Sequence, residues 1–511
     1  MKKILSILLI AVMTVCCFNG CGKSATTKGD KNKILIKYWL SGYGDDWINN
    51  MIEGFEKKYP EYDVEIEMTA SASAVNSSFG HEDADEADLY FCSKDISFYE
   101  YLEPLNDILE TKVEGESMTI GEKMMPSYLA LEKYKDGNYY NLTYGSGAVG
   151  IYYNKAMFNE YGLSVPRTTD ELVNVCATLW DYKEKAFCHF KPVGYWENYM
   201  PDVFMVQYDG LDYVLNNFYG CTDEQGNSPS LDVLTKQDGR FEALKVFESI
   251  ITPEYVMVGS NSYDHITAQT MWLEGEAAMM VNGTWIVNEM QSVMTMEDFA
   301  LMRTPVITSI LDHLTTITTD KQLRQVVSAI DSVTDGEKEE SDYLKDGQYM
   351  VGDLAVSADD WTRVRLARNT MALNAPGDSA YIPNYSDNIE GAKAFLTYMY
   401  SDEGYKIYTD TLHSTLPMRP SEGEVDMSGW TEVSKQQAHI VDTTEQFISE
   451  YNASAHDVFN LAGARWKGNG RDFLDRFCSN NTADRITAVD AWNDILAVMK
   501  DNYSTWIEDI K

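Results

Sequence analysis

Apolar and polar residues near the start of the chain follow patterns that predict a strand, a helix and two further strands. Residues 34–39 are mostly apolar, and residues 64–68 alternate apolar side chains with glutamates, as a half-buried strand does. Between them, Trp47, Met51 and Phe55 follow the spacing of one helix face. Residues 87–91 predict another short strand. This order indicates an α/β lobe with a parallel sheet.

The same two patterns return along the rest of the chain. Further strands are predicted at residues 147–153 and 277–281, and further helix faces within residues 171–179, 241–251, 392–399 and 489–499. One segment breaks the pattern, because residues 331–345 are acidic and polar. We expect it to be an exposed loop or an insertion.

The first twenty residues carry a different pattern. Lys2 and Lys3 precede an apolar run over residues 4–18, and a small residue, Gly20, stands before Cys21. Charge, an apolar stretch and then a small residue are the layout of a secretory signal peptide. The run is shorter than the roughly 20 residues that a membrane-spanning helix needs. We therefore predict a signal peptide over residues 1–20.

Residues 18–21 resemble the lipobox of bacterial lipoproteins, a family in which the cysteine sulfur receives a diacylglycerol and becomes the new N-terminus. The resemblance implies that Cys21 is lipidated, although Phe18 stands where the family prefers Leu, and Cys16 is a second candidate. Residues 21–32 are rich in Lys, Thr, Gly and Ser and are expected to form a flexible tether. The expected location is the extracytoplasmic face of the cell membrane.

Composition narrows the classes of function. A chain of 511 residues suits two or three lobes, and its formal net charge is −39. Loss of Lys2 and Lys3 with the signal peptide makes the mature chain still more acidic. Such a surface repels phosphate backbones, so we expect no binding to nucleic acid.

The cysteines predict neither a disulfide framework nor a zinc site. Eight are present, but no CxxC pair occurs among them. A single bridge between Cys176 and Cys188 stays open as one interpretation. The other is that both are buried small hydrophobic residues.

Familiar catalytic motifs are absent from the sequence. There is no HExxH, GxSxG or Walker loop. Residues 145–150 match GxGxxG with Asp170 twenty residues on, but Tyr152 and Tyr153 continue a predicted strand where a dinucleotide site needs a helix. The acidic cluster from His81 to Asp88 is interpreted as a loop. We therefore expect no catalytic residues, no cofactor and no metal.

Five segments together resemble the extracellular solute-binding proteins of ABC importers, in the family that includes the maltose-binding protein. These segments are residues 34–60, 150–172, 275–285, 392–404 and 416–419. Their order and spacing cover most of residues 34–420, whereas residues 305–350 and the chain after 420 match less clearly.

The resemblance implies a two-lobed α/β fold with a hinge and a ligand cleft between the lobes. Residues 31–148 and 303–400 would form the first lobe, and residues 149–302 and 401–511 the second. Ligand would lie in the cleft, and closure of the lobes would trap it. The expected partners are a carbohydrate, the membrane subunits of an importer and the membrane itself through the lipid. We expect the protein to be a monomer.

A sugar presents apolar C–H faces and a rim of hydroxyl groups, so aromatic rings and charged side chains at strand ends are the candidate ligand-binding residues. Trp285 matches a Gly-x-Trp position at which the family commonly stacks a sugar. The remaining candidates lie in turns or in the family segments: Trp39, Tyr43, Asp95, Trp196, Tyr381 and Arg419.

Two other classes of function stay open at this point. The chain carries 80 acidic residues, and a glycosidase needs only two well-placed carboxylates, so a secreted glycan-active enzyme is one alternative. The other is a surface receptor that binds a different solute, such as a peptide or a polyamine, without delivering it.

Overall fold

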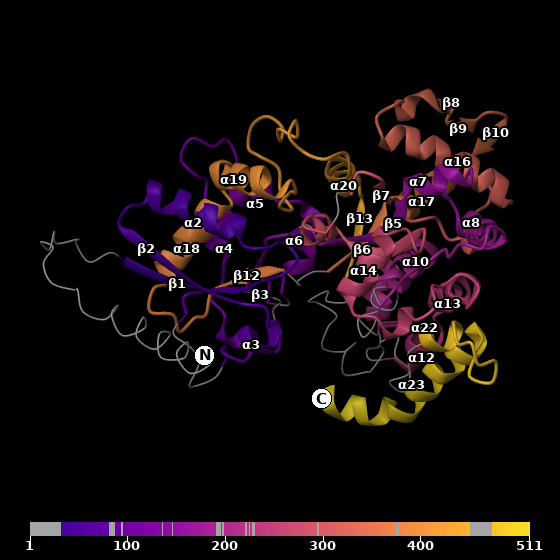
Figure 1. The fold of residues 1–511 in the computed structure, drawn as a ribbon, viewed down its shortest axis with the longest axis horizontal. Helices are drawn as coiled ribbons and strands as arrows, with labels where there is room; N and C mark the ends of the chain where they lie inside the picture. The colour runs from indigo at the N-terminus through magenta and orange to yellow at the C-terminus, as the bar shows by residue number, and fades with distance from the viewer. Residues whose placement is uncertain are drawn as a thin grey trace, which may run out of the picture.

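The computed structural model shows two lobes, each built around its own sheet (Figure 1). It describes residues 32–80, 87–92, 96–134, 136–145, 147–190, 196, 199–219, 222–223, 225–226, 230–293, 296–374, 378–449 and 473–510 of the 511. The predicted signal peptide, the predicted tether up to residue 31 and both candidate lipidation sites, Cys16 and Cys21, lie outside the described residues. In the part described, no helix is both long enough and apolar enough to cross a membrane.

The first lobe forms around a five-stranded sheet with the order β2-β1-β3-β12-β4. Its strands are β1 (Asn32–Trp39), β2 (Tyr62–Thr69), β3 (Leu89–Cys92), β4 (Leu142–Thr143) and β12 (Ser379–Tyr381). β1 pairs in parallel with β2 and β3, which confirms the predicted parallel sheet. β12 runs antiparallel between β3 and β4, although it comes from a distant part of the chain.

Helices cover the first-lobe sheet. They are α2 (Asp46–Lys58), α3 (Ala72–Asn76), η1 (Ile96–Tyr101), α4 (Asn106–Glu110), α5 (Ile120–Lys123), α6 (Pro126–Glu132), α18 (Ile389–Met399) and α19 (Asp402–Leu412). The face of α2 that the spacing predicted is buried, with Trp47, Met51 and Phe55 fully enclosed. Phe55 packs against Phe395 of α18 with ring centroids 5.2 Å apart, so the two helices share one core.

The second lobe forms around the strand β5, which pairs antiparallel with three others. Its strands are β5 (Ala148–Asn154), β6 (Met279–Gly283), β7 (Phe299–Met302), β11 (Thr370–Leu373) and β13 (Gln446–Ile448). β5 begins at Ala148 within the GxGxxG match and continues as a strand, so the structure confirms that this match opens no nucleotide-binding helix.

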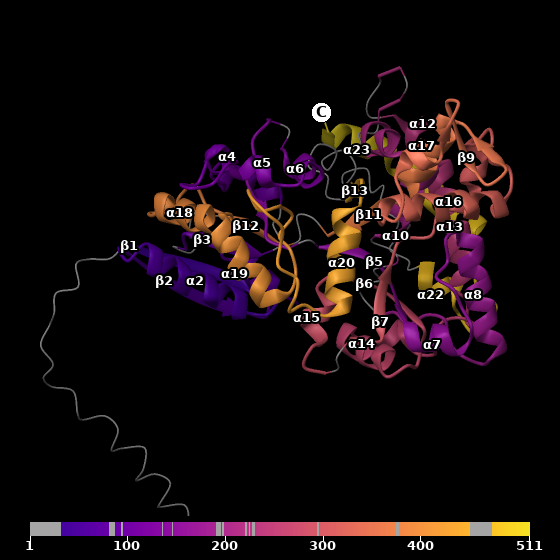
Figure 2. The same ribbon diagram turned by 90° about the horizontal axis from the view of Figure 1, so that it is seen from above.

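Many helices surround this second sheet. They are α7 (Lys155–Glu160), α8 (Thr169–Asp181), α10 (Met200–Asp209), α11 (Leu211–Tyr213), η2 (Val214–Tyr219), α12 (Leu231–Thr235), α13 (Asp238–Ile250), η3 (Ser260–Ser262), α14 (His265–Leu273), α15 (Ile286–Met290), η4 (Thr308–His313), α16 (Asp320–Thr334), α17 (Ala358–Arg368), α20 (Glu432–Asp442), α22 (Phe473–Phe477) and α23 (Ala488–Ile510). Figure 2 shows α20 on the side of the second lobe that faces the first.

The division of the chain between the lobes differs from the predicted one at two places. Residues 303–373 lie with the second lobe and not the first, because β11 pairs with β5 and β13, and α17 packs against α10. Conversely, α19 lies in the first lobe, packed on α2. The chain therefore crosses between the lobes after β4, after β11 and after α19.

Two of these crossings are hydrogen-bonded to each other. The backbone N–H of Asn374 donates to the carbonyl of Gly147 at 2.9 Å. Gly147 has a φ of 52°, a left-handed conformation that glycine adopts without strain. The side chain of Asn374 also accepts from the hydroxyl of Tyr199 at 2.8 Å. The crossings thus form one joined hinge rather than separate linkers.

The acidic segment 331–345 is only partly the exposed loop that its composition predicted. Residues 331–334 are the last turn of α16, and the chain then forms η5 (Glu340–Asp342) and a small antiparallel sheet. The strands of this sheet are β8 (Leu344–Lys345), β9 (Gln348–Val351) and β10 (Leu354–Val356). Tyr349 of β9 stacks on Trp361 of α17 with centroids 4.4 Å apart, which fixes the sheet to the second lobe.

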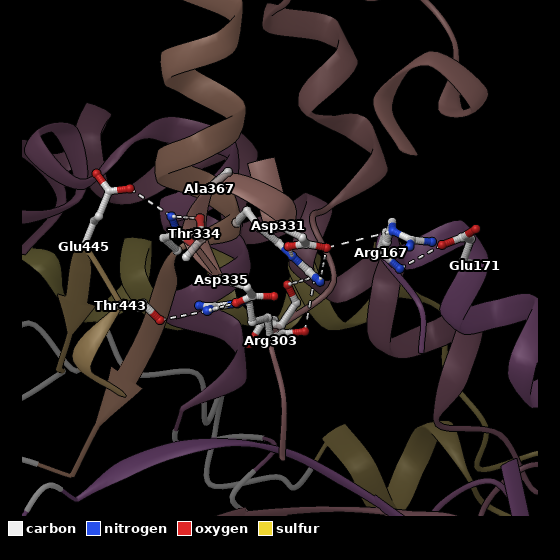
Figure 3. Close-up of polar contacts among 12 residues, drawn as sticks. Arg167, Glu171, Arg303, Asp331, Thr334, Asp335, Ala367, Thr443 and Glu445 are labelled. Carbon is white, nitrogen blue, oxygen red and sulfur yellow. Dashed lines mark hydrogen bonds and ion pairs between the residues drawn. The ribbon is translucent and has the colours of Figure 1, made fainter. Parts of the chain in front are cut away.

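A polar network joins α16 and α17 to the rest of the second lobe (Figure 3). Arg368, 5% exposed, donates from Nε and Nη2 to the Asp331 carboxylate at 2.7 and 3.0 Å. Its Nη1 donates to the carbonyls of Arg303 and Thr304. Arg303 in turn pairs with Asp335 at 2.8 Å. Asp331 belongs to a segment that was predicted to be exposed. Its hydrogen bonds with Arg368 fix its side chain in the second lobe.

The cysteines among the described residues behave as small hydrophobic residues. Cys176 and Cys188 are both free and fully buried, so the bridge between them is excluded. Burial raises the pKa of the Cys188 thiol to about 11, which keeps it protonated and unreactive near neutral pH.

We expect Arg368→Ala to lower the free energy of unfolding by about 3 kcal/mol, because it removes the two hydrogen bonds to Asp331 and those to two carbonyls and leaves Asp331 only its 3.9 Å ion pair with Arg167. Arg365→Ala is the matched control, since Arg365 makes a half-exposed ion pair with Glu445, and it should cost less than about 1 kcal/mol. Urea denaturation followed by circular dichroism measures both. Equal losses for the two variants would contradict a structural role for the network.

Candidate functional site

The two lobes touch where the loop after β1 meets the turn after β6. A Cβ added to Gly42 of the first lobe would lie 3.0 Å from Cδ1 of Trp285 in the second. The Trp285 ring also covers Gly283, where a Cβ would collide with the ring carbons. Only 8% of Trp285 is exposed in this arrangement. Two glycines, one from each lobe, therefore allow the tryptophan to sit at the junction.

Tyr43 connects the same loop to the hinge. Its hydroxyl accepts from the backbone N–H of Gly147 at 3.4 Å, and its ring lies against Gly145. The Tyr43 ring also meets Tyr144 edge to face, with centroids 6.3 Å apart. The loop after β1 is thereby held against the first crossing, which places its polar groups at the lobe junction.

Three polar groups on the first-lobe side of the junction lack well-formed hydrogen bonds. The Oγ of Ser41 and the hydroxyl of Tyr144 are buried without one. Asp378, 4% exposed, follows the second crossing, and burial raises the pKa of its carboxyl to about 7. Sequence reasoning missed Tyr144 and Asp378. An acidic residue that follows a Pro-Gly pair in the sequence and stands directly before β12 was the signal that could have found Asp378.

The structure brings together only some of the residues that the sequence singled out. Tyr43 and Trp285 lie at the lobe junction, as described. Trp39 ends β1 and is half-buried against the cluster that contains Tyr90. Asp95 lies outside the described residues. The other three candidates lie elsewhere.

Those three residues have structural partners that account for them. Trp196 is fully buried and meets Phe187 edge to face at 4.9 Å. Tyr381 is 1% exposed and stacks on Tyr90 at 5.5 Å. Arg419 is exposed and pairs with Asp442 at 2.9 Å. Trp196 and Tyr381 thus pack in a lobe core, and Arg419 is exposed beside an acidic partner. The ligand contact predicted for each stays a prediction.

A small hollow lies beside the junction, between Thr284 of the second lobe, the segment after α19 and α20. Its space of about 10 Å³ suits about one water molecule and cannot hold a sugar. The described residues also gather no group of three or more His, Cys, Asp or Glu that could hold a metal ion.

Two α/β lobes joined by three crossings, with an aromatic side chain at their junction, define the class of two-lobed solute-binding proteins. The sequence model for the bacterial extracellular solute-binding proteins matches residues 41–406, and the chain belongs to this family.

Relatives in this family share modest identity with the chain. The multiple sugar-binding protein of Streptococcus mutans is 23% identical over 290 residues, 56% of this chain and 65% of that protein. The diacetylchitobiose binding protein NgcE of Streptomyces coelicolor is 23% identical over 279 residues, 52% of this chain. The aligned part spans only 55% of NgcE, so neither relative is matched over its whole length.

Solved structures show the same fold. The GacH receptor of Streptomyces glaucescens superposes with a TM-score of 0.58, covering 92% of this chain and 99% of that one at 15% identity. A chitin oligosaccharide binding protein gives 0.57, covering 94% and 100% at 17% identity. At these identities the likeness concerns the fold alone, and it confirms the predicted two-lobed architecture.

We expect Gly42→Val to hold the lobes apart, because the added Cβ and methyl groups would collide with Trp285. The radius of gyration in small-angle X-ray scattering should increase relative to the unchanged protein. Gly429→Val is the matched control, since a Cβ there meets nothing within 4 Å. Identical radii for all three proteins would show that the Gly42–Trp285 contact does not form in solution.

Proposed function

We propose that this protein captures a carbohydrate, most simply an oligosaccharide, between its lobes and delivers it to the membrane subunits of an ABC importer. The observation that carries this proposal is Trp285, an aromatic ring from the second lobe that is pressed against the loop after β1 in the first. An indole ring offers a flat apolar surface to the C–H face of a sugar. Closure of the lobes over that ring would trap the solute.

Two further observations support a sugar over other solutes. The relatives matched by sequence are named for binding multiple sugars and diacetylchitobiose. In addition, the first-lobe side of the junction offers Ser41, Tyr144 and Asp378, whose hydroxyl and carboxyl groups suit a partner rich in hydroxyls.

We also propose that the protein is held at the extracytoplasmic face of the membrane by a lipid on Cys21. The support is the sequence pattern of residues 1–21 together with the extracellular character of the family. Tethering keeps a solute-capturing protein near its importer, and a tether over residues 21–32 would leave both lobes free to move.

A thermal-shift screen with malto-, xylo-, chito- and raffinose-type oligosaccharides tests the sugar proposal. Ligand at 100 times its Kd stabilises the folded state by about 2.7 kcal/mol, which should raise Tm by roughly 3 °C for a chain of this length. A peptide or a polyamine that raises Tm when no glycan does would overturn it. Chromatography of the incubated sugars decides against a glycan-active enzyme if no cleavage product forms.

For a sugar found in that screen, Trp285→Ala should weaken binding at least about tenfold, because the stacking surface is lost. Trp180→Ala is the matched control, since Trp180 is 36% exposed at the end of α8, and its loss should leave Kd unchanged. Calorimetric titration measures both. An unaltered Kd in the Trp285 variant would remove this residue from the site.

The anchor is tested in cells with a clickable fatty-acid analogue. The unchanged protein and Cys16→Ala should incorporate the label and sediment with membranes. Cys21→Ala should lose the label. Labelling that depends on Cys16 and not on Cys21 would move the lipid to the other candidate.

A further inference from the structure

A pocket lies behind α20, between that helix, the end of β7 and the ends of α16 and α17. Its volume is about 250 Å³, far more than a single water molecule needs. Gln436 and His439 of α20 line this pocket, whereas Ser434 and Gln437 of the same helix line the small hollow beside the lobe junction. The pocket is therefore separate from the site proposed for the sugar. We call it the arginine pocket, after the three arginines in its lining.

The side chains that line the arginine pocket carry a net positive charge. Apart from a histidine, its titratable groups of acidic or basic charge are three arginines and two aspartates: Arg167, Arg303, Arg368, Asp331 and Asp335. The histidine, His439, adds a further positive charge when it is protonated. This excess runs against the formal net charge of −39 of the whole chain. A positive pocket in an acidic protein concentrates anions from solution.

The two aspartates of the pocket already have strong partners. Arg368 donates to both carboxylate oxygens of Asp331. Asp335 accepts from Nη2 of Arg303 at 2.8 Å and from Nε2 of His439 at 3.0 Å. Burial acts to raise the pKa of Asp335, but the hydrogen bonds from His439 and Arg303 outweigh it and hold this pKa below its ordinary value. Both carboxylates are thus neutralised without the remaining donors of the pocket.

Arg303 and Arg167 keep donors that the described part of the chain does not use. Arg303 is 7% exposed and reaches Asp335 and Thr443 through Nη2 alone, so no described residue accepts from its Nε or Nη1. Arg167 approaches Asp331 only to 3.9 Å, through Nε, and no described residue accepts from its Nη1 or Nη2. Unpaired N–H groups on a buried guanidinium are costly, so an acceptor that enters the pocket is favoured.

The arginine pocket has an exposed rim and a buried base. The side chains of Arg167, Asp335 and His439 at the rim are 39, 42 and 45% exposed, whereas Arg303 and Arg368 are buried. Figure 3 shows Arg303 and Asp335 close together, with Arg167 beside Asp331. A small solute can therefore enter from the surface and meet Arg167 first and Arg303 further in.

We propose that the arginine pocket binds a small oxyanion that carries more than one negative charge, such as phosphate or a short dicarboxylate. Its oxygens accept hydrogen bonds from the free N–H groups of Arg303 at the base and of Arg167 at the rim. Hydrogen bonds between a guanidinium and an oxyanion are among the strong ones in proteins. Because Arg303 follows β7 and Arg167 precedes α8, the bound anion links these two parts of the second lobe.

Titration of the protein with inorganic phosphate, followed by Tm and by calorimetry, tests the proposal, and a parallel titration with malonate compares a dicarboxylate. Ionic strength is held constant with sodium chloride, because salt screens the repulsion among the acidic side chains. At least one of the two anions should raise Tm in a saturable way, by about 3 °C at 100 times its Kd. If neither anion raises Tm beyond the chloride control, or if the rise does not saturate, the proposal is overturned.

Variants locate the anion. Arg167→Ala should weaken its Kd at least about tenfold, and Arg303→Lys, which keeps the positive charge but has fewer donors, about threefold to tenfold. Arg365→Ala is the matched control, because it removes a positive charge from the same lobe but pairs with Glu445 outside the pocket, and it should leave Kd unchanged. An unaltered Kd in both pocket variants, or an equal loss in the control, would overturn the assignment. These titrations contain no sugar, so their outcome is independent of the function proposed for the lobe junction.

Discussion

The hydrogen bond between Asn374 and Gly147 joins two segments that each pass from one lobe to the other. The residues described at the lobe junction lie beside this hydrogen-bonded pair. Tyr43, in the loop after β1, accepts a hydrogen bond from Gly147. Tyr144 lies three residues before Gly147 and donates its backbone N–H to Asp378, which follows the second crossing. Since Gly147 has a left-handed backbone, the chain can turn there without strain. A hinge of this kind lets two rigid lobes move as bodies while the residues beside it stay in register.

The local fold was predictable from the sequence wherever one face of an element is buried. The 3/4 spacing of α2 identified this helix correctly, because burial of one face imposes that period. The alternation of β2 also identified the strand, although Val64 and Ile66 are only partly buried and Met68 is exposed. The assignment of residues 303–373 to a lobe was not predictable in the same way. That assignment depends on the pairing of β11 with β5, two strands that lie far apart in the sequence. The pattern of apolar residues in either strand does not indicate which strand it pairs with.

Candidate site residues were predictable from the sequence where an aromatic residue follows the end of a strand. They were not predictable where two crossings between the lobes bring the residues together. Trp285 and Tyr43 follow β6 and β1, so their positions in the sequence pointed to the junction. Trp196 and Tyr381 have similar local surroundings in sequence but pack into lobe cores. Asp378 and Tyr144 meet only because the first and second crossings are adjacent. That adjacency cannot be inferred from a single sequence.

The placement of β12 has a consequence for how the chain reaches its fold. β12 lies between β3 and β4, and the hydrogen bond from Asn141 to Ser379 links residues 238 positions apart. The first-lobe sheet therefore cannot be completed until the whole of the intervening second-lobe segment has been synthesised. Contacts of such long sequence separation slow folding, because the loop must close before the contacts stabilise it. For export through the signal peptide predicted over residues 1–20, slow closure of the first sheet would lengthen the time during which the chain can be threaded through a translocation pore.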